Sequence, residues 1–275
     1  MVVQHNLQAA NTNRQLGITT SAQAKSTEKL SSGYKINRAA DDAAGLSISE
    51  KMRSQIRGLN KASSNAQDGV SLVQTAEGAL NETHSILQRM NELATQSANG
   101  TNTSVDRSAI RAELDQLTSE INRIQSTTQF NTMNLLDGTF SGKTNQMKLQ
   151  VGALSGQSIN FSIANMSATK IGLKTDLSVS TFSKAGSYMK AVQDAIEVVS
   201  KQRSAMGAIQ NRLEHTIANL DTTSENTQSA ESRIRDTDMA SEMVTYSKNN
   251  ILAQAGQSML AQANQSTQGV LSLLQ

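Results

Sequence analysis

A heptad repeat of apolar and small residues over residues 59–97 is the most regular pattern in the chain. Its first line of positions spaced by seven consists of Leu59, Ala66, Val73, Leu80, Leu87 and Ala94. A parallel line that widens the apolar face consists of Leu72, Ala79, Ile86 and Leu93. Because heptad spacing keeps one face of a helix turned toward its partners, this pattern predicts a long helix that packs against more than one other helix.

Two further helices of this kind are predicted downstream. Residues 99–102 (Asn-Gly-Thr-Asn) form a helix stop, and Thr103 and Asp106 have the spacing of a capping box for a helix over 104–128. We expect that helix to fold back antiparallel on the first. Helix resumes near Ser187, with a line of sevens made of Val192, Val199, Met206, Leu213 and Leu220.

The two ends of the chain carry weaker apolar seams. Residues 3–31 form a narrow seam that ends at a break, Ser31-Ser32-Gly33, and Asp41 and Asp42 follow where a new helix could start. A last helix runs to the C-terminus beyond a polar segment, 222–231. Because neither seam is wide enough to hold a fold alone, we expect the N-terminal and C-terminal helices to pair with each other.

The middle of the chain changes to the alternation typical of strands. Residues 147–151 and 158–163 alternate apolar and polar positions with period two, which predicts a hairpin around residues 153–157. The predicted fold is therefore mainly α, a long antiparallel helical bundle or coiled coil with a small β-hairpin region and paired terminal helices. Its expected domains are 1–33 plus 236–275, 34–137 plus 187–235, and a β-rich segment at 138–186.

Composition supports long helices and excludes several classes of function. Aromatic residues make up 3% of the chain, and it contains no proline, tryptophan or cysteine. The 25 basic and 23 acidic residues are well mixed, which argues against a nucleic-acid partner. No stretch is apolar enough to span a membrane, and residues 1–20 lack the apolar core of a signal peptide.

Residues that could carry chemistry are scattered. The three histidines lie on different helical stretches, and adjacent carboxylates such as Asp41 and Asp42 point about 100° apart on a helix. Capping or ion pairing is the better interpretation of that pair. With no phosphate-binding loop and no nucleophile elbow, we expect no enzyme, no catalytic residue, no cofactor and no metal site.

Four segments of the chain resemble the bacterial flagellins. They are residues 31–46 (SSGYKINRAADDAAGL), 67–80 (QDGVSLVQTAEGAL), 129–131 (QFN) and the terminal 251–274 with its Val270-Leu271-Ser272-Leu273-Leu274. The segments are long, independent and in the family's order, and the resemblance covers about residues 1–140 and 187–275. Only about residues 138–186 remain for an outer region, so a short form without large outer domains is expected.

The resemblance implies a structural subunit that self-assembles into the bacterial flagellar filament for motility. It implies a homopolymer outside the cell, exported by the flagellar type III apparatus without a cleaved signal peptide, with an export chaperone and cap or junction proteins as further partners. The terminal positions expected at the assembly interface are Leu7, Leu16, Leu30, Leu252, Met259, Leu260, Val270 and Leu273. In this family the terminal helices fold on assembly.

The family is also recognised by Toll-like receptor 5. The residues that match the positions involved are Gln88, Arg89 and Leu93 on the long helix and Glu113 on the next one. The alternative is that this face serves only the packing of subunits in the filament.

Two other functions stay open at this point. A hook-filament junction protein of the same superfamily would not form long polymers alone. A secreted binding or signalling module would be a stable monomer with protected terminal helices.

Overall fold

The computed structural model describes residues 6–142, 145–173 and 178–272, and contains five α-helices and four short strands in those residues. The chain divides into two compact units, one made of residues 1–55 and 225–275 and the other of residues 56–224. Two helices, α2 (Ala43–Ser97) and α4 (Phe182–Arg235), contribute to both units. The mainly helical fold predicted from the sequence is confirmed.

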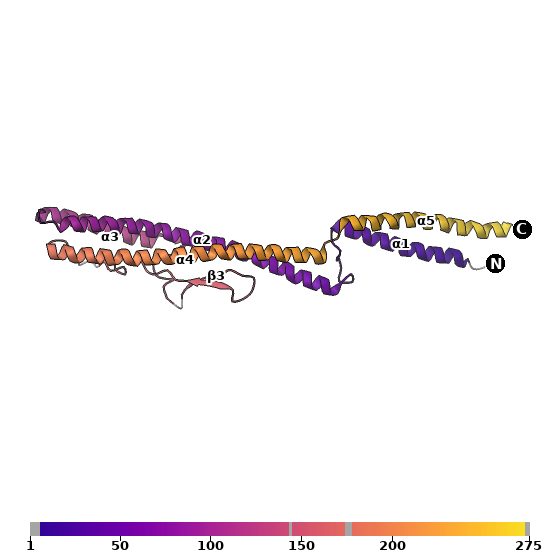
Figure 1. Cartoon of the computed structure of the whole chain (residues 1–275), viewed down its shortest axis with the longest axis horizontal. Helices are drawn as coiled ribbons and strands as arrows, with labels where there is room; N and C mark the ends of the chain where they lie inside the picture. The colour runs from indigo at the N-terminus through magenta and orange to yellow at the C-terminus, as the bar shows by residue number, and fades with distance from the viewer. Residues whose placement is uncertain (1–5, 143–144, 174–177, 273–275) are drawn as a thin grey trace. The chain divides into compact units, whose positions relative to one another are not determined.

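The first unit contains the paired terminal helices, α1 (Leu7–Ser32) and α5 (Met239–Ser272) (Figure 1). They run antiparallel: the Asn6 side-chain amide donates to the Ala263 carbonyl at 3.1 Å, and Lys29 at the other end of α1 lies 3.9 Å from Glu242. A side chain on Gly256 would lie 3.2 Å from Leu16, so the two helices approach closely there. The predicted pairing of the terminal helices is confirmed.

Local signals set the ends of α1 and the start of α2. The Asn6 side chain accepts a hydrogen bond from the Ala9 amide at 2.9 Å, and Gly33 ends α1 with a φ of +74° that a residue with a Cβ adopts only at a cost. Asp42 accepts a hydrogen bond from the Gly45 amide at 2.9 Å at the start of α2. The break at Gly33 and the capping role expected at Asp42 are therefore confirmed.

The second unit holds the hydrophobic core of the chain. It packs α3 (Ser104–Thr127) and the adjoining parts of α2 and α4 side by side (Figure 1). The predicted heptad lines are buried: Leu80 and Leu87 on α2 and Val192, Val199 and Leu213 on α4 are all 0% exposed. The capping box also forms, because Thr103 and Asp106 each accept a hydrogen bond from the other's backbone amide.

Two small antiparallel hairpins lie between α3 and α4. β1 (Gln129–Phe130) pairs with β2 (Met133–Asn134) through Asn131 and Thr132, both of which have positive φ. β3 (Met147–Gln150) pairs with β4 (Ser158–Phe161), with Met147 opposite Phe161 and Gln150 opposite Ser158. This second hairpin was predicted from the alternating pattern, whereas the first was not.

Small residues on α2 let the second hairpin approach the helix. A Cβ on Gly58 would lie 2.8 Å from that of Ala153, and one on Gly69 would overlap Leu149. The Asn65 side chain donates to the Gln150 carbonyl at 3.2 Å. A Cβ at Gly58 would need Ala153 in the turn of the hairpin to shift, whereas one at Gly69 would need the end of the Leu149 side chain to move.

Helix α4 is longer than its pattern predicts. It begins at Phe182 rather than near Ser187, and it continues through the polar segment 222–231 to Arg235. In that segment the Thr222 hydroxyl donates to the carbonyl of the preceding turn and Ser224 bonds to Asn60 at 2.7 Å. The Ser224 bond to Asn60 anchors this polar segment to α2, so the segment is held in the helix by a tertiary contact although it has no apolar line of its own.

Candidate functional site

The terminal helix pair exposes most of its large apolar side chains. In residues 7–32 and 239–266, the part of the pair whose side chains the structure describes, only Ser26 of α1 and Ala253 and Ala263 of α5 are buried, and all three are small. The exposed large apolar side chains of the pair are Leu7, Ile18, Met239, Met243, Val244, Ile251, Leu252 and Met259. Such a density of exposed apolar groups is unusual for a surface that stays in water and is typical of an interaction site.

The residues expected at the assembly interface fall into three groups. Leu7, Leu252 and Met259 are 70%, 47% and 53% exposed. Leu16, Leu30 and Leu260 are half-buried, and Leu16 lies against Gly256 of α5. Leu273 and the side chain of Val270 lie outside the described part of the chain.

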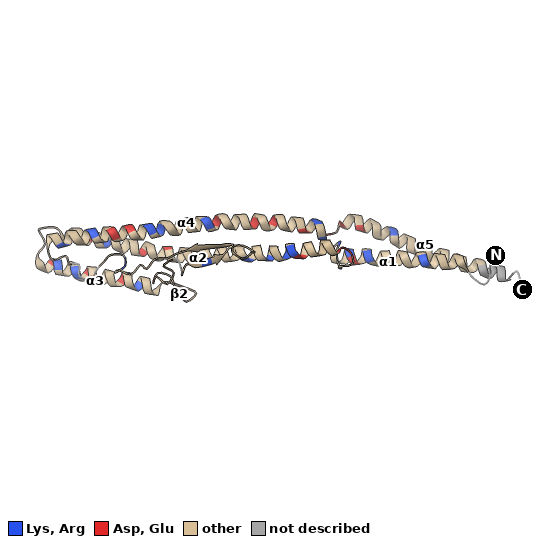
Figure 2. Cartoon of the chain, turned by 90° about the horizontal axis from the view of Figure 1, so that it is seen from below, with Lys and Arg blue, Asp and Glu red and all other residues tan. Residues whose placement is uncertain are grey.

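A shallow apolar groove runs between α1 and α5. It has a volume of about 500 Å³ and is lined by Asn11, Thr12, Gln15, Leu16, Thr19, Leu252, Ala255, Gly256 and Met259. The α5 side of the groove carries little charge, since Glu242 and Lys248 are the two acidic or basic side chains among the 34 residues of α5, whereas on the α1 side Arg14 donates to Asn11 at 3.3 Å (Figure 2). Apolar groups with few charges are what the centre of a protein–protein interface contains.

A cluster of four side chains joins the two segments that enter and leave the terminal pair. Tyr34 contacts two guanidinium groups, with Arg235 at 4.6 Å and Arg53 at 5.7 Å from the ring centroid. The Arg53 Nε lies 3.5 Å from Glu231, a carboxylate that is 8% exposed. Cation–π contacts of this kind stabilise by about 0.5–2 kcal/mol each.

These four residues, Tyr34, Arg53, Glu231 and Arg235, are called the Tyr34 cluster below. Backbone hydrogen bonds reinforce it. The Lys35 amide donates to the Arg235 carbonyl at 2.7 Å, and the Thr237 amide donates to the Gly33 carbonyl at 3.0 Å. The segments after α1 and after α4 are therefore held side by side, which fixes the end of α1 beside the start of α5. Sequence reasoning missed the cluster because its members come from separate elements and follow no periodic pattern.

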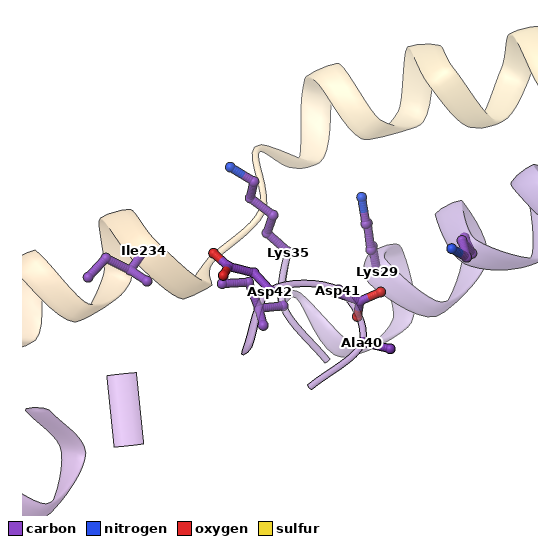
Figure 3. Close-up of a pocket in the computed structure, with 8 residues that line it drawn as sticks. Lys29, Lys35, Ala40, Asp41, Asp42 and Ile234 are labelled. Atoms are coloured by element: carbon purple, nitrogen blue, oxygen red, sulfur yellow. The ribbon is translucent and has the colours of Figure 1, made fainter. Parts of the chain in front are cut away.

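A hollow of about 290 Å³ lies beside the same segments (Figure 3). Its charged lining comprises Lys25, Lys29, Lys35, Asp41 and Asp42. The backbone amides of Arg38 and Asn37 donate to Asp41 at 3.0 and 3.3 Å and hold the pKa of that carboxyl below its ordinary value, with smaller contributions from Lys25 and Lys29. Both carboxylates thus serve to build the turn before α2, and no paired-carboxylate chemistry is available.

The residues expected to meet the immune receptor lie in the second unit. Arg89 on α2 donates to Glu113 on α3 from Nη2 at 3.0 Å and from Nε at 3.2 Å, and it also contacts Glu92 at 3.3 Å. These hydrogen bonds, that of Glu113 first, raise the pKa of Arg89 above its ordinary value. Gln88 is exposed beside His84, with 3.0 Å between their side-chain nitrogens.

Leu93 differs from the other three residues of this set. It is 2% exposed and belongs to the core of the second unit, whereas the side chains of Arg89 and Glu113 are 53% and 46% exposed. The structure thus brings Arg89 and Glu113 together on the surface and places Leu93 beneath it.

The described residues contain no group of three or more metal-binding side chains close enough to hold an ion. No helix in those residues has the length and apolarity needed to cross a membrane.

Comparison with known proteins identifies the family. The models of the bacterial flagellin N-terminal helical region and of the bacterial flagellin C-terminal helical region match residues 3–141 and 189–274. A flagellin of Halalkalibacterium halodurans is 55% identical over 276 residues, covering all of both chains. The flagellar filament 31.3 kDa core protein of Treponema maltophilum is 50% identical, again over the whole of both chains.

A solved structure agrees with this assignment. The crystal structure of Bacillus cereus flagellin matches with a TM-score of 0.51 at 30% identity, covering 57% of this chain and 88% of that one. The two family models together span most of the residues, and both relatives match over their whole length with at least 50% of residues identical. The chain therefore belongs to the bacterial flagellin family.

Proposed function

We propose that this chain is a structural subunit of the bacterial flagellar filament and that α1 and α5 form its principal assembly surface. The observation that carries the proposal is the exposed apolar surface of the terminal pair. Val244, Ile251 and Leu7 are 71%, 66% and 70% exposed, in a pair of helices that buries only small side chains in its described residues. Neighbouring copies of the same pair supply the apolar surface that would cover these groups.

The chemistry of the surface favours a polymer of identical chains. A surface that binds a different surface of the next copy gives a head-to-tail contact, and repetition of that contact produces an open helical filament when the rotation between copies does not close into a ring. Small residues along α1 and α5 allow close approach, while the near absence of charge on α5 avoids burying unpaired charges. The proposed filament lies outside the cell, and the proposal includes export through the flagellar type III apparatus with an export chaperone and cap or junction proteins as further partners.

The test is a polymerisation trial followed by electron microscopy. A variant with Ile251→Asn and Leu252→Asn places polar groups at side chains that are 66% and 47% exposed in the single chain, so its fold should be unchanged. The matched control is Gln257→Asn with Gln262→Asn, two exposed positions on the same helix. We expect long filaments from the parent and the control, and none from the double asparagine variant.

Other results would lead to a different function. Filaments from the asparagine variant as long as those of the parent would contradict the assignment of the surface. If the parent itself stayed monomeric when seeded with filament fragments, the hook-filament junction protein would become the better interpretation. Circular dichroism of each variant before the trial separates loss of assembly from loss of fold.

We further propose that the chain is a ligand of Toll-like receptor 5 through Gln88, Arg89 and Glu113, with Leu93 supporting the surface from below. Support comes from the Arg89–Glu113 ion pair, which fixes two exposed charged groups from different helices in one place. Arginine is enriched among the residues that dominate binding at protein interfaces, and a side chain held in place loses less entropy on binding.

The chain offers a matched control for this second proposal. Arg123 and Glu120 form an exposed ion pair on α3 with the same chemistry, at 2.6 Å. We expect Arg89→Ala and Glu113→Gln each to weaken binding to the receptor ectodomain by more than about tenfold, and Arg123→Ala and Glu120→Gln to leave it unchanged. Unchanged receptor binding in Arg89→Ala and Glu113→Gln would contradict the proposal and favour the alternative that the Arg89 face serves only the packing of subunits.

A further inference from the structure

The turn between α2 and α3 contains the one Asn-Gly dipeptide of the chain, Asn99-Gly100. Both residues are exposed. The Asn99 backbone amide donates to the Gln96 carbonyl at 3.1 Å, but its side-chain amide makes no hydrogen bond with any described residue. The Gly100 amide makes no hydrogen bond with a described residue, and a Cβ on Gly100 would meet no atom within 4 Å, so the space around the residue is open. The turn thus combines a free side-chain amide with an accessible backbone nitrogen next to it.

This arrangement can carry out a reaction within the chain. The peptide nitrogen of Gly100 attacks the side-chain carbonyl carbon of Asn99 and forms a new C–N bond, which closes a five-membered succinimide ring. The bond from that carbon to the amide nitrogen breaks, and ammonia leaves with the proton that the Gly100 nitrogen gives up. Water then opens the ring at one of its two carbonyls, giving aspartate or isoaspartate at position 99. The reaction needs only water and no oxidant, reductant or enzyme.

The backbone nitrogen becomes a good nucleophile only when it has lost its proton. The negative charge is then shared with the carbonyl oxygen of the same peptide group, which is the Asn99 carbonyl. Two donors point at that oxygen: Arg107 Nη2 at 3.3 Å and the Asn102 amide at 3.3 Å. Positioned donors at an oxygen where negative charge develops lower the barrier to a reaction, and a charged donor has the larger effect.

The structure also holds Arg107 in place for this role. Its Nη1 donates to the Ser180 carbonyl at 3.2 Å, just before α4 begins, so the guanidinium group bridges two segments of the second unit. In an unfolded chain Arg107 would be close to Asn99 in sequence but would not be oriented toward its carbonyl. Any rate effect of Arg107 is therefore a property of the folded turn.

We propose that Asn99 is a site of spontaneous deamidation in the folded protein and that Arg107 promotes the reaction by stabilising the deprotonated Asn99–Gly100 peptide group. The product is favoured at its position as well. Arg107 already donates to the backbone carbonyl of residue 99, so a carboxylate introduced on the same residue gains a nearby positive charge close to the N-terminal end of α3, where the helix dipole stabilises negative charge. The isoaspartate form lengthens the backbone of the turn by one carbon atom.

The experiment ages the full-length monomer in mildly alkaline buffer and measures deamidation by mass spectrometry. A protease that cleaves after glutamate releases residues 93–113, which contain both Asn99 and Asn102, so Asn102 serves as an internal reference. The variants are Gly100→Ala, which hinders the attacking nitrogen in a place where a Cβ fits, and Arg107→Gln. The control is Arg111→Gln, whose side chain lies one turn further along α3 and contacts Asp115 at 4.0 Å.

We expect Asn99 to deamidate much faster than Asn102 in the parent, and Gly100→Ala to slow the reaction more than tenfold. Arg107→Gln should slow it by about tenfold, the size of effect that one hydrogen bond to a charged group produces, and Arg111→Gln should not change it. In denaturant the difference in rate between the parent and the Arg107→Gln variant should disappear. Equal rates for the parent and Arg107→Gln when both are folded, or a difference that persists in denaturant, would overturn the role of Arg107. An Asn99 rate equal to that of Asn102 would overturn the site itself.

Discussion

Leu213→Ala and Leu252→Ala remove the same atoms from two helices with very different surroundings. Leu213 of α4 is 0% exposed in the core of the second unit, whereas Leu252 of α5 is 47% exposed. For a fully buried leucine the loss combines the transfer free energy with the cost of a cavity, about 3 kcal/mol. For Leu252 we expect a change within about 0.5 kcal/mol, as for other surface substitutions. The difference follows from burial alone.

The assay is thermal and urea unfolding followed by far-ultraviolet circular dichroism, because the chain has no tryptophan to report by fluorescence. Spread over the 169 residues between Ile56 and Ser224, a loss of about 3 kcal/mol lowers the Tm of the second unit by roughly 6–12 °C. Leu252→Ala should leave that transition in place but weaken polymerisation. Similar shifts of the main transition in both variants would refute the view that the terminal pair lacks a core of its own.

Three further predictions concern the second unit, and each is checked by the same unfolding measurements. Gly78→Ala, whose Cβ meets no neighbour, should stabilise by about 0.5–1 kcal/mol, whereas Gly58→Ala forces a Cβ within 2.8 Å of that of Ala153 and should destabilise by about 1 kcal/mol. Burial raises the pKa of Tyr188 to about 12, and a hydrogen bond with Thr118 opposes this shift. The contribution of the neutral phenol to the free energy of unfolding is therefore complete below pH 10.0 and is lost as the pH rises toward 12. Tyr188→Phe has no proton to lose, so it should resist alkaline unfolding better than the parent. Thr103→Ala removes the N-terminal cap of α3 and should cost about 1 kcal/mol, and no measurable loss would show that the cap is dispensable.

Periodic features of the sequence predicted the helical part of the fold well. The heptad lines beginning at Leu59 and Val192 mark residues that are buried in the second unit, because residues spaced by seven lie on one face of a helix and that face packs against the partner helices. The capping box at Thr103 and the β3–β4 hairpin were likewise predicted from local patterns. Membership of the flagellin family, whose members are structural proteins, also confirms that the chain is not an enzyme.

Two kinds of feature were not predicted: a turn that lacks its usual residues, and contacts between residues distant in sequence. The β1–β2 hairpin turns through Asn131 and Thr132 with positive φ at both, whereas the usual signal for such a turn has glycine at the second position. The Tyr34 cluster draws Arg53 and Arg235 from two other helices, so no local pattern announces it. The burial of Leu93 follows from its heptad line, but its expected role came from the family resemblance, which carries no information on exposure.

The Tyr34 cluster has a physical role at the place where α1 ends and α5 begins. Its cation–π contacts and the backbone hydrogen bond from Lys35 to Arg235 hold the segment that follows α1 against the segment that follows α4. A pair of helices that starts from one fixed point needs to order fewer residues independently when it meets a neighbouring copy.

Hydrogen–deuterium exchange of α1 and α5 in the monomer and in the filament tests the central claim most directly. The claim is that the terminal pair, which buries only small side chains in its described residues, is stabilised by neighbouring copies. The account predicts fast exchange over residues 7–32 and 239–272 in the monomer, slow exchange of the same residues in the filament, and slow exchange of residues 192–220 in both. Terminal helices as protected in the monomer as residues 192–220 would contradict it and would favour a stable secreted module.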